Sequence, residues 1–211
     1  PNVWRRLVTR NCLYGVDNDP FAVNVARLRL WLSLAVEFDG DSPPPLPNLD
    51  FKIELGDSLA SPWPEATAKL TFQDELVKRF RDAKGEYLTA HSGPKDTLRK
   101  EIDRLKTDIG QWAHGKTKVA GFDWVVEFAE VFVEGGFDIA IANPPYRRQE
   151  GLGAEKVQLE RLYPQVYAST ADYHVYFYNR SVQILRNSGV LSFITSNKYM
   201  RAGYGEKIRG F

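Results

Sequence analysis

Residues 137–146 read Phe-Asp-Ile-Ala-Ile-Ala-Asn-Pro-Pro-Tyr, and this stretch decides the fold. Its first six residues are mostly apolar and indicate a buried strand, which the two prolines end because proline offers no N–H to a neighbouring strand. Similar strands, each followed by a polar turn, are indicated at 12–16, 49–55 and 190–195, and helical segments lie between them. Alternating strands and helices predict an α/β fold with a mostly parallel, doubly wound sheet.

The helical segments between these strands differ in their signals. Asp19-Pro20 combines a good N-cap with a residue suited to the first helical position, and residues 21–36 are apolar on nearly every face, so this helix is expected to be deeply packed. Further helices are expected over 122–134 and 173–187. Residues 147–171 lack clear periodicity and are expected to form a loop that moves or contacts a ligand.

Residues 71–115 differ in kind from the rest of the chain. Thr71 and Asp74 have the spacing of a capping box, and a break at Ser92-Gly93-Pro94 separates two amphipathic helices. Apolar residues recur in both helices at steps of three and four, at Leu76, Phe80, Ala83 and Tyr87 and then at Leu98, Ile102, Leu105, Ile109 and Trp112. We therefore expect three parts: residues 1–70, a helical hairpin inserted at 71–115, and residues 116–211.

Composition excludes several classes of protein. The 211 residues contain one cysteine, Cys12, which cannot form a disulfide within the chain and is expected in the core of the strand at 12–16. A hydrophobic content of 43% argues against disorder, and the longest apolar stretch, 28–36, is too short to cross a membrane. A reducing compartment, the cytoplasm, is the expected location.

The net charge of +1 conceals two basic blocks. Residues 78–118 hold 11 basic and 6 acidic residues, and residues 147–211 hold 10 and 5. Such blocks either meet phosphates or form solvated faces.

The polar turns are expected to share one edge of the sheet, because ligands of open parallel sheets bind outside the carboxyl ends of the strands. Asp17 follows the first strand and can accept hydrogen bonds from the two hydroxyls of a ribose, although a capping turn explains it equally well. Asp57, in Gly56-Asp57-Ser58, can accept from the exocyclic amine of an adenine, or it simply forms a turn. The three histidines lack metal-like spacing, so no metal site is expected.

The Asn143-Pro144-Pro145-Tyr146 turn is a more specific signal. The side-chain oxygen of Asn143 and the carbonyl of Pro144 can both accept hydrogen bonds from one NH2 group, and the prolines stiffen these acceptors. An aromatic amine held in this way becomes a better nucleophile, because the acceptors stabilise the charge that develops on its nitrogen. Tyr146 would stack on the flat substrate, as side chains do on flipped bases.

In these motifs the sequence resembles adenine-specific DNA methyltransferases that use S-adenosylmethionine. The order of the matching segments, 15–20, 56–58, 137–146 and 172–197, is that of the gamma-type amino-methyltransferases. Segments 124–128 and 198–205 look closest to the methylase regions of type IIG restriction-modification and related phage-defence enzymes. The resemblance implies a Rossmann-like class I methyltransferase sheet and double-stranded DNA as the partner.

The resemblance also implies roles for particular residues. Asp17 would hold the cofactor ribose and Asn18 would lie against the cofactor adenine, whose amino group Asp57, followed by Ser58, would bind. A flipped target adenine would be held by Asn143, Pro144, Pro145 and Tyr146. The next two residues, Arg147 and Arg148, would contact phosphates or remain solvated loop arginines.

The sequence departs from this family in one respect: a glycine-rich cofactor loop of the form Phe-x-Gly-x-Gly is expected upstream of Asp17 and is absent. A target-recognition domain is not visible either. We therefore expect an internal piece of a larger polypeptide, inactive alone, whose cofactor-side half is 1–70 and whose catalytic half is 116–211. Two alternatives remain: a methyltransferase acting on protein glutamine or on RNA, and a non-catalytic piece that supports assembly or binds DNA.

Overall fold

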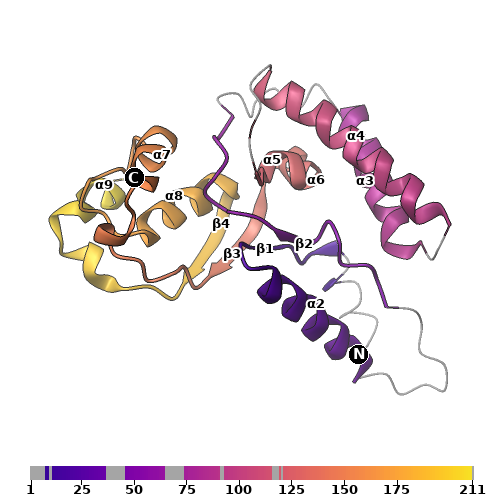
Figure 1. Ribbon diagram of the computed structural model, residues 1–211, viewed down its shortest axis with the longest axis horizontal. Coiled ribbons are helices and arrows are strands. Elements are labelled where there is room, and N and C mark those ends of the chain that lie inside the picture. The colour runs from indigo at the N-terminus through magenta and orange to yellow at the C-terminus, as the bar shows by residue number, and fades with distance from the viewer. Residues whose placement is uncertain are drawn as a thin grey trace. The chain divides into compact units, whose positions relative to one another are not determined.

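The computed structural model describes residues 8–9, 11–36, 46–64, 74–90, 93–115, 119 and 121–210 (Figure 1). These residues form two compact units. Unit 1 takes its described residues from 1–60 and 66–130, and unit 2 takes them from 61–65 and 131–211. The expected capping box at 71–74 lies largely outside the described residues, and His91, one of the three histidines, lies outside them too.

Unit 1 contains a parallel pair of short strands, β1 (Gly15–Asp17) and β2 (Ile53–Leu55), joined through α2 (Pro20–Ala35). Asp19 caps α2 as expected, because its side chain accepts a hydrogen bond from the backbone N–H of Phe21 at 2.8 Å. One side of α2 packs on the strand pair through a core that contains Val23, Leu49 and Ile53.

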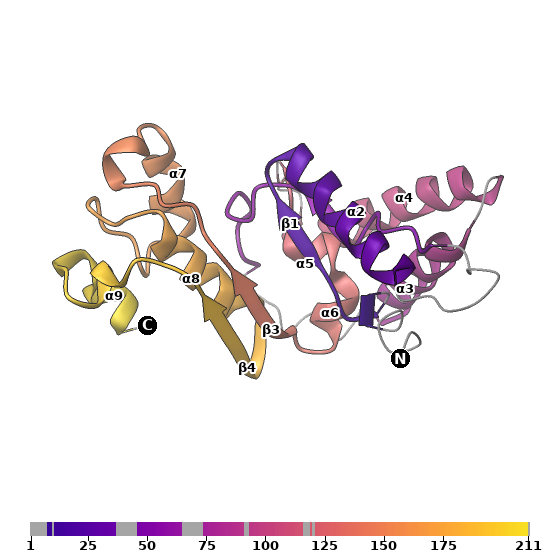
Figure 2. The same cartoon turned by 90° about the horizontal axis from the view of Figure 1, so that it is seen from below.

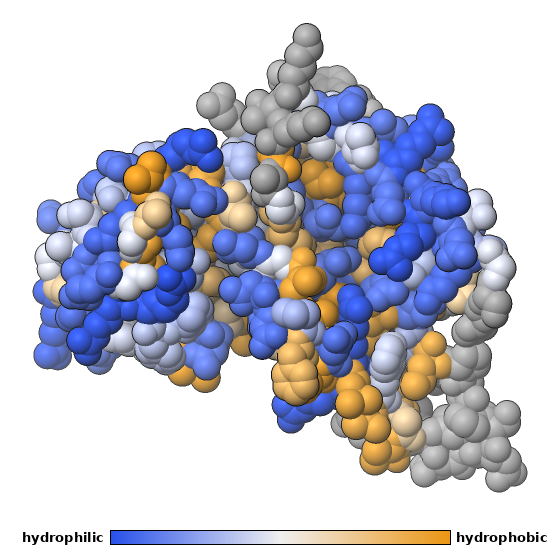
Figure 3. Space-filling model, in the orientation of Figure 1, coloured by the Kyte–Doolittle hydropathy of each residue, from blue (hydrophilic) through white to orange (hydrophobic). Residues whose placement is uncertain are grey.

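Two expectations for this region are wrong. The N–H of Cys12 donates to the Val8 carbonyl at 2.8 Å and so closes a helical turn, which leaves the Cys12 side chain exposed ahead of the strand instead of in the core. The α2 helix is not deeply packed, because the described residues cover only one of its sides. Its other side exposes four apolar residues, and Figure 3 shows hydrophobic side chains gathered over this helix: Phe21, Leu28, Leu32 and Val36.

The helices α3 (Asp74–Thr89) and α4 (Pro94–His114) run side by side in both views (Figures 1 and 2), which confirms two helices in the expected region. Their predicted seams are largely buried, as Phe80, Ile102 and Ile109 show with exposed fractions of 0%. The seams explain why the two helices pair. Apolar residues at steps of three and four form a stripe along one side of a helix, and each helix can bury its stripe against the other.

The segment expected as one helix over 122–134 is instead two short helices, α5 (Trp124–Glu127) and α6 (Ala129–Val133). They are interrupted at Phe128, whose backbone has left the helical region at φ −126° and ψ 39°. The Phe128 ring is fully buried and lies edge-on to the rings of Tyr14 and Trp124. Burying this ring accompanies the break in the helix.

Unit 2 contains a second parallel pair, β3 (Phe137–Ala142) and β4 (Leu185–Phe193), joined through α8 (His174–Ile184). The bounds of β3 are those predicted. The helix α8 ends earlier than predicted, at Ile184. Gly136, at φ 114°, lies close to this end of the helix, since a Cβ on it would be 2.7 Å from the Ile184 carbonyl oxygen. Strand pairing therefore starts at Leu185, with an irregular register before Val190.

The core of unit 2 contains Arg180, which is only 2% exposed. Its Nε and Nη2 atoms donate to the Tyr163 hydroxyl at 3.1 and 2.9 Å, and Nη2 also donates to the Ser61 carbonyl. Its guanidinium lies 5.6 Å from the centre of the Trp63 ring. Arg180 therefore holds the segment around residue 61 against α8.

The expected loop at 147–171 contains regular structure, a short helix η2 (Gln149–Gly151) followed by α7 (Glu155–Leu162). The α7 helix packs through Leu159, which is 4% exposed, and its other residues are largely polar, so its sequence shows little periodicity. After β4 the chain forms η3 (Asn197–Met200), η4 (Gly203–Gly205) and α9 (Glu206–Arg209) instead of a plain polar tail.

The described residues thus have a mixed α/β architecture whose strands pair in parallel, in two pairs. None of the helices among these residues is both long enough and apolar enough to cross a membrane.

Candidate functional site

The first group of predicted site residues lies in unit 1, at the carboxyl ends of β1 and β2. Asp17 pairs with Leu55, so the turns after the two parallel strands leave from the same edge. The N–H of Gly56 donates to the Asp17 carbonyl at 2.9 Å and fixes the second turn beside the first. Asp17 and Asp57 are therefore brought to one edge of the strand pair.

Both carboxylates are exposed, and each makes one local hydrogen bond. The Oδ1 atom of Asp17 accepts from the N–H of Asp19 at 2.8 Å, and that of Asp57 accepts from the N–H of Leu59 at 2.9 Å. Among the described residues no donor reaches the second oxygen of either carboxylate. These oxygens can accept hydrogen bonds from hydroxyl or amino groups of a ligand. Asn18 is exposed directly after Asp17.

Two aromatic residues contact the turn that carries Asp57. The indole Nε1 of Trp124 donates to the Ser58 carbonyl at 3.0 Å. Phe122 packs so tightly on Gly56 that a Cβ there would lie 2.2 Å from the Phe122 Cβ. Only glycine fits this position, and the turn is therefore rigidly placed. The sequence gives no local signal for the hydrogen bond between Trp124 and Ser58, which are 66 residues apart.

Buried charges lie elsewhere in unit 1. The Lys84 ammonium, on α3, donates to Glu130 Oε1 at 2.7 Å and to the Glu127 carbonyl at 2.9 Å. Lys52 Nζ lies 3.7 Å from the centre of the Tyr14 ring, and burial lowers the pKa of Lys52 to about 8. The Lys84 contacts join α3 to α5 and α6, and the Lys52 contact joins the residue before β2 to Tyr14.

Unit 1 also has a pocket of about 850 Å³ at the end of α4. It is lined by residues of α4 and α5, and among them His114 Nε2 lies 2.6 Å from Asp123 Oδ2. Asp123 also caps α5 by accepting from the N–H of Val125 at 2.9 Å. None of the site residues predicted from the sequence lines this pocket.

The second group of predicted site residues lies in unit 2, at the carboxyl end of β3. Asn143 is exposed and Pro144 is buried. Within the described part of the chain, no hydrogen bond engages the Asn143 side chain or the Pro144 carbonyl. Neither acceptor is therefore engaged by a donor from these residues, and the prolines stiffen the backbone that carries them.

Tyr146 presents a ring that is fixed at its hydroxyl end. The side chain is 63% exposed, and its hydroxyl donates to the Ile194 carbonyl at 3.2 Å. The N–H of Ile194 in turn donates to the Ala142 carbonyl at 3.1 Å, so the segment after β4 lies beside the Asn-Pro-Pro-Tyr turn. An anchored, exposed ring of this kind can stack on a planar group.

A cluster of aromatic side chains borders this second segment. The hydroxyl of Tyr178, on α8, lies 2.8 Å from Thr195 Oγ1, and its ring centre lies 5.1 Å from that of Tyr199. Burial and the hydrogen bond with Tyr178 raise the pKa of Tyr199 to about 12. The imidazole of His174 lies nearby, and burial lowers its pKa, so both groups are neutral at pH 7.

The two arginines after Tyr146 have different surroundings. Arg147 makes a bidentate ion pair with Glu155, at 3.0 and 2.8 Å, and its guanidinium lies 4.9 Å from the centre of the Tyr173 ring. Arg148 is exposed, and no hydrogen bond or ion pair engages its side chain among the described residues. Arg147 is therefore engaged within the protein, whereas Arg148 is available to a ligand.

Asp172 ties the segments on either side of this turn together, and sequence reasoning missed it. Its Oδ1 accepts from the N–H of Gln149 at 3.4 Å and its Oδ2 accepts from the Tyr204 hydroxyl at 2.9 Å. This hydrogen bond and burial raise the pKa of Tyr204 to about 12, burial being the larger cause. The sequence placed Asp172 at the start of the 172–197 segment that resembles the methyltransferases, but gave this residue no role of its own.

Residues 11–211 match the sequence profile of a protein family described as the Eco57I restriction-modification methylase. The chain belongs to this family. The match includes both groups of site residues, from Asp17 to Ser58 in unit 1 and from Asn143 to Tyr146 in unit 2.

Individual relatives carry names that agree with the family. The type II methyltransferase M.PaeR7I of Pseudomonas aeruginosa is 30% identical over 162 residues, which cover 76% of this chain and 27% of that protein. The type II restriction enzyme and methyltransferase RM.Eco57I of Escherichia coli is 25% identical over 214 residues, covering 98% of this chain and 16% of that protein. The type II methyltransferase M.BstVI of Geobacillus stearothermophilus is 37% identical over 76 residues, covering 36% and 13%. The chain spans about a quarter or less of the length of these relatives.

Proposed function

We propose that this member of the Eco57I methylase family transfers a methyl group from S-adenosylmethionine to the exocyclic nitrogen of an adenine flipped out of double-stranded DNA. The observation that carries the proposal is the turn at Asn143–Tyr146, which combines two available acceptors with an anchored, exposed aromatic ring. The family, and the type II relatives, favour DNA as the substrate. The parallel strand pairs suit a Rossmann-like class I methyltransferase sheet.

The target amine is held by Asn143 and Pro144. The side-chain oxygen of Asn143 and the Pro144 carbonyl each accept one hydrogen bond from the NH2 group, which draws its lone pair out of conjugation with the ring. Positive charge that develops on the nitrogen is stabilised by the same two oxygens. After transfer, the methylated nitrogen loses its surplus proton to water.

Tyr146 holds the base itself. Base stacking on an aromatic side chain contributes about 1–3 kcal/mol. Because the Tyr146 hydroxyl is bound to the Ile194 carbonyl, the ring is already oriented before the base arrives. Pro145 restricts the backbone between the acceptors and the ring.

Asp17 and Asp57 fit the hydroxyl and amino groups of an adenosyl cofactor. Each has a carboxylate oxygen that the described residues leave available, at one edge of the β1–β2 pair. When bound, S-adenosylmethionine supplies a methyl group whose bond to a cationic sulfur breaks as the amine nitrogen bonds the carbon, leaving the sulfur neutral. Asp17 would hold the ribose, Asn18 would lie against the adenine, and Asp57, with Ser58 beside it, would accept from the adenine amino group.

The experiment that tests this proposal is Asn143→Ala in the full-length protein, assayed by transfer of radiolabelled methyl from S-adenosylmethionine to duplex DNA. We expect the rate to fall about 100-fold or more, because one of two groups that stabilise the developing charge is lost. Cofactor affinity, measured by calorimetry, should stay within about threefold of wild type, since removal of one such group acts on the transfer step. Asn24→Ala, at an exposed position on α2, is the matched control and should leave the rate unchanged.

A rate close to wild type for Asn143→Ala would contradict the assigned role. The same assay with RNA and with a glutamine-containing protein substrate tests the choice of DNA. Transfer confined to either of these would overturn DNA as the substrate while keeping the role of Asn143.

A further inference from the structure

Most basic side chains of the block at 147–211 are bonded to other groups of the protein, so fewer of them can bind a ligand than the sequence suggests. Arg147 and Arg180 are engaged with Glu155 and Tyr163, and Arg186 pairs with Asp138. Lys156, Lys207 and Arg209 donate to Gln149 and to the backbone carbonyls of Ser169, Tyr167, Tyr199 and Ala202. These six side chains are therefore poor candidates for contact with a ligand.

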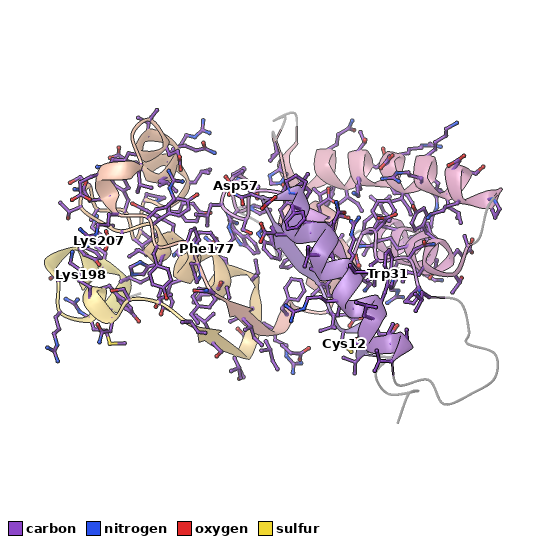
Figure 4. The ribbon with its side chains drawn as sticks, turned by 60° about the horizontal axis from the view of Figure 1, so that its bottom comes forward. Cys12, Trp31, Asp57, Phe177, Lys198 and Lys207 are labelled. Atoms are coloured by element: carbon purple, nitrogen blue, oxygen red, sulfur yellow. The ribbon has the colours of Figure 1, made fainter. Side chains whose placement is uncertain are left out.

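Two of the remaining cations flank the Asn-Pro-Pro-Tyr turn. Arg148 is two residues after Tyr146, and Lys198 is four residues after Ile194, whose carbonyl binds the Tyr146 hydroxyl. Both side chains are exposed, and neither has a hydrogen-bond or ion-pair partner within the described residues. Figure 4 labels Lys198 on the segment that follows β4.

The segments that carry these two cations are joined. Asp172 accepts from the N–H of Gln149, next to Arg148, and from the hydroxyl of Tyr204, which follows η3. The charges of Arg148 and Lys198 both help to lower the pKa of Glu150, after the larger effect of hydrogen bonds from its own backbone and from Gln149. Glu150 is thus close enough to both cations to be affected by their charges. Its charge of −1 neutralises only half of their combined charge of +2.

We propose that Arg148 and Lys198 bind backbone phosphates of the nucleic acid strand whose base enters the turn at Asn143–Tyr146. This inference rests on the proposed function, because it takes the substrate of that turn to be a nucleic acid. Two exposed cations on joined segments are suited to phosphates, which position a strand without reading its sequence. Arg147 has no such role, since its guanidinium is occupied by Glu155 and stacked on Tyr173.

The test is the salt dependence of DNA binding by the protein and its variants, with a 30-base-pair duplex as the probe. Each phosphate contact adds about 0.9 to the slope of log affinity against log salt concentration. We expect Arg148→Gln and Lys198→Gln each to reduce that slope by about 0.9, and the double variant by about 1.8. Affinity should fall equally for duplexes of different sequence, and Arg148→Lys should restore the slope.

Arg186→Gln is the matched control. It removes a half-exposed arginine of the same basic block. Arg186 pairs with Asp138 near the amino-terminal ends of β4 and β3, whereas the Asn-Pro-Pro-Tyr turn follows the carboxyl end of β3. Its slope should equal that of wild type. The phosphate role would be refuted if the slope of the double variant equalled that of wild type. It would also be refuted if Arg186→Gln reduced the slope as much as the double variant does.

This outcome is separable from failure of the proposed function. If wild type methylates DNA and the double variant keeps its slope, only the phosphate pair is wrong. If the full-length wild-type protein transfers no methyl group to DNA, the proposed function itself fails.

Discussion

Gly56→Ala is the substitution for which the structure gives the sharpest expectation. A Cβ at this position would lie 2.2, 2.5 and 2.8 Å from the Cβ, Cγ and Cδ2 atoms of Phe122, distances that real Cβ atoms essentially never show. Phe122 cannot move away easily, because it is 6% exposed and its ring lies 5.3 and 5.8 Å from those of Trp124 and Phe128. The added methyl group must therefore displace the turn or the aromatic cluster.

We expect Gly56→Ala to lower the free energy of unfolding by about 3 kcal/mol, the upper end of the range for overpacked cores. Urea unfolding followed by tryptophan fluorescence measures this change, since Trp124 belongs to the cluster. The control is Gly85→Ala in the middle of α3, where a Cβ meets nothing within 4 Å. That change should stabilise the protein by up to about 1 kcal/mol, because alanine favours a helix over glycine.

The two glycine substitutions are thus expected to differ by about 4 kcal/mol in opposite directions. If Gly56→Ala unfolds within about 0.5 kcal/mol of wild type, the ordinary scatter of harmless substitutions, the contact with Phe122 does not constrain the turn.

Three further predictions concern single side chains. Burial lowers the pKa of Lys52 to about 8, whereas the unfolded chain keeps this proton up to its ordinary pKa of 10.5, so stability is reduced below pH 8 and recovers as the pH rises towards 10.5. Lys52→Met should therefore stabilise the protein by about 2 kcal/mol at pH 7, after subtracting about 1 kcal/mol for the lost contact with the Tyr14 ring. Above pH 10.5 this stabilisation should disappear. Equal effects of the substitution on urea unfolding at both pH values would contradict this prediction. Tyr146→Phe should slow methyl transfer about fivefold and Tyr146→Ala about 10- to 100-fold, and equal losses would show that the ring does not stack. Asp123→Ala removes the cap of α5 and the buried partner of His114. It should lower the free energy of unfolding in urea by about 3 kcal/mol. A decrease below about 1 kcal/mol would contradict the pairing of Asp123 with His114.

Local sequence patterns predicted the elements that depend on neighbouring residues. The bounds of β3 followed from an apolar run that two prolines end, and the N-terminus of α2 followed from Asp19. The paired helices α3 and α4 followed from apolar residues at steps of three and four. In each case the deciding interaction spans a few residues, so the sequence contains it directly.

The features that the sequence did not reveal depend on contacts between distant residues. The break between α5 and α6 accompanies burial of the Phe128 ring, and the exposure of Cys12 depends on a helical turn closed by Val8. The α7 helix was missed because most of its residues face water and only a few apolar side chains, Leu159 among them, pack inward.

For the candidate site, the sequence identified the residue types at the strand ends but not what surrounds them. It treated Arg147 and Arg148 alike, whereas the fold occupies only the first, through Glu155 and Tyr173. It gave no sign of Asp172 as the link between two segments, because its partners lie 23 and 32 residues away. The roles of Asp17 and Asp57 remain predictions that cofactor binding can test.

The contact between Arg180 and the Ser61 carbonyl has a consequence for how the protein folds. The two residues are 119 positions apart, yet both belong to unit 2, so this unit is assembled from a short early segment and a long late one. Closing so long a loop is slow compared with pairing α3 with α4, which are neighbours in sequence. During synthesis the hairpin can therefore form well before unit 2 does. The early segment around Ser61 therefore lacks its contact with Arg180 until α8 has been made.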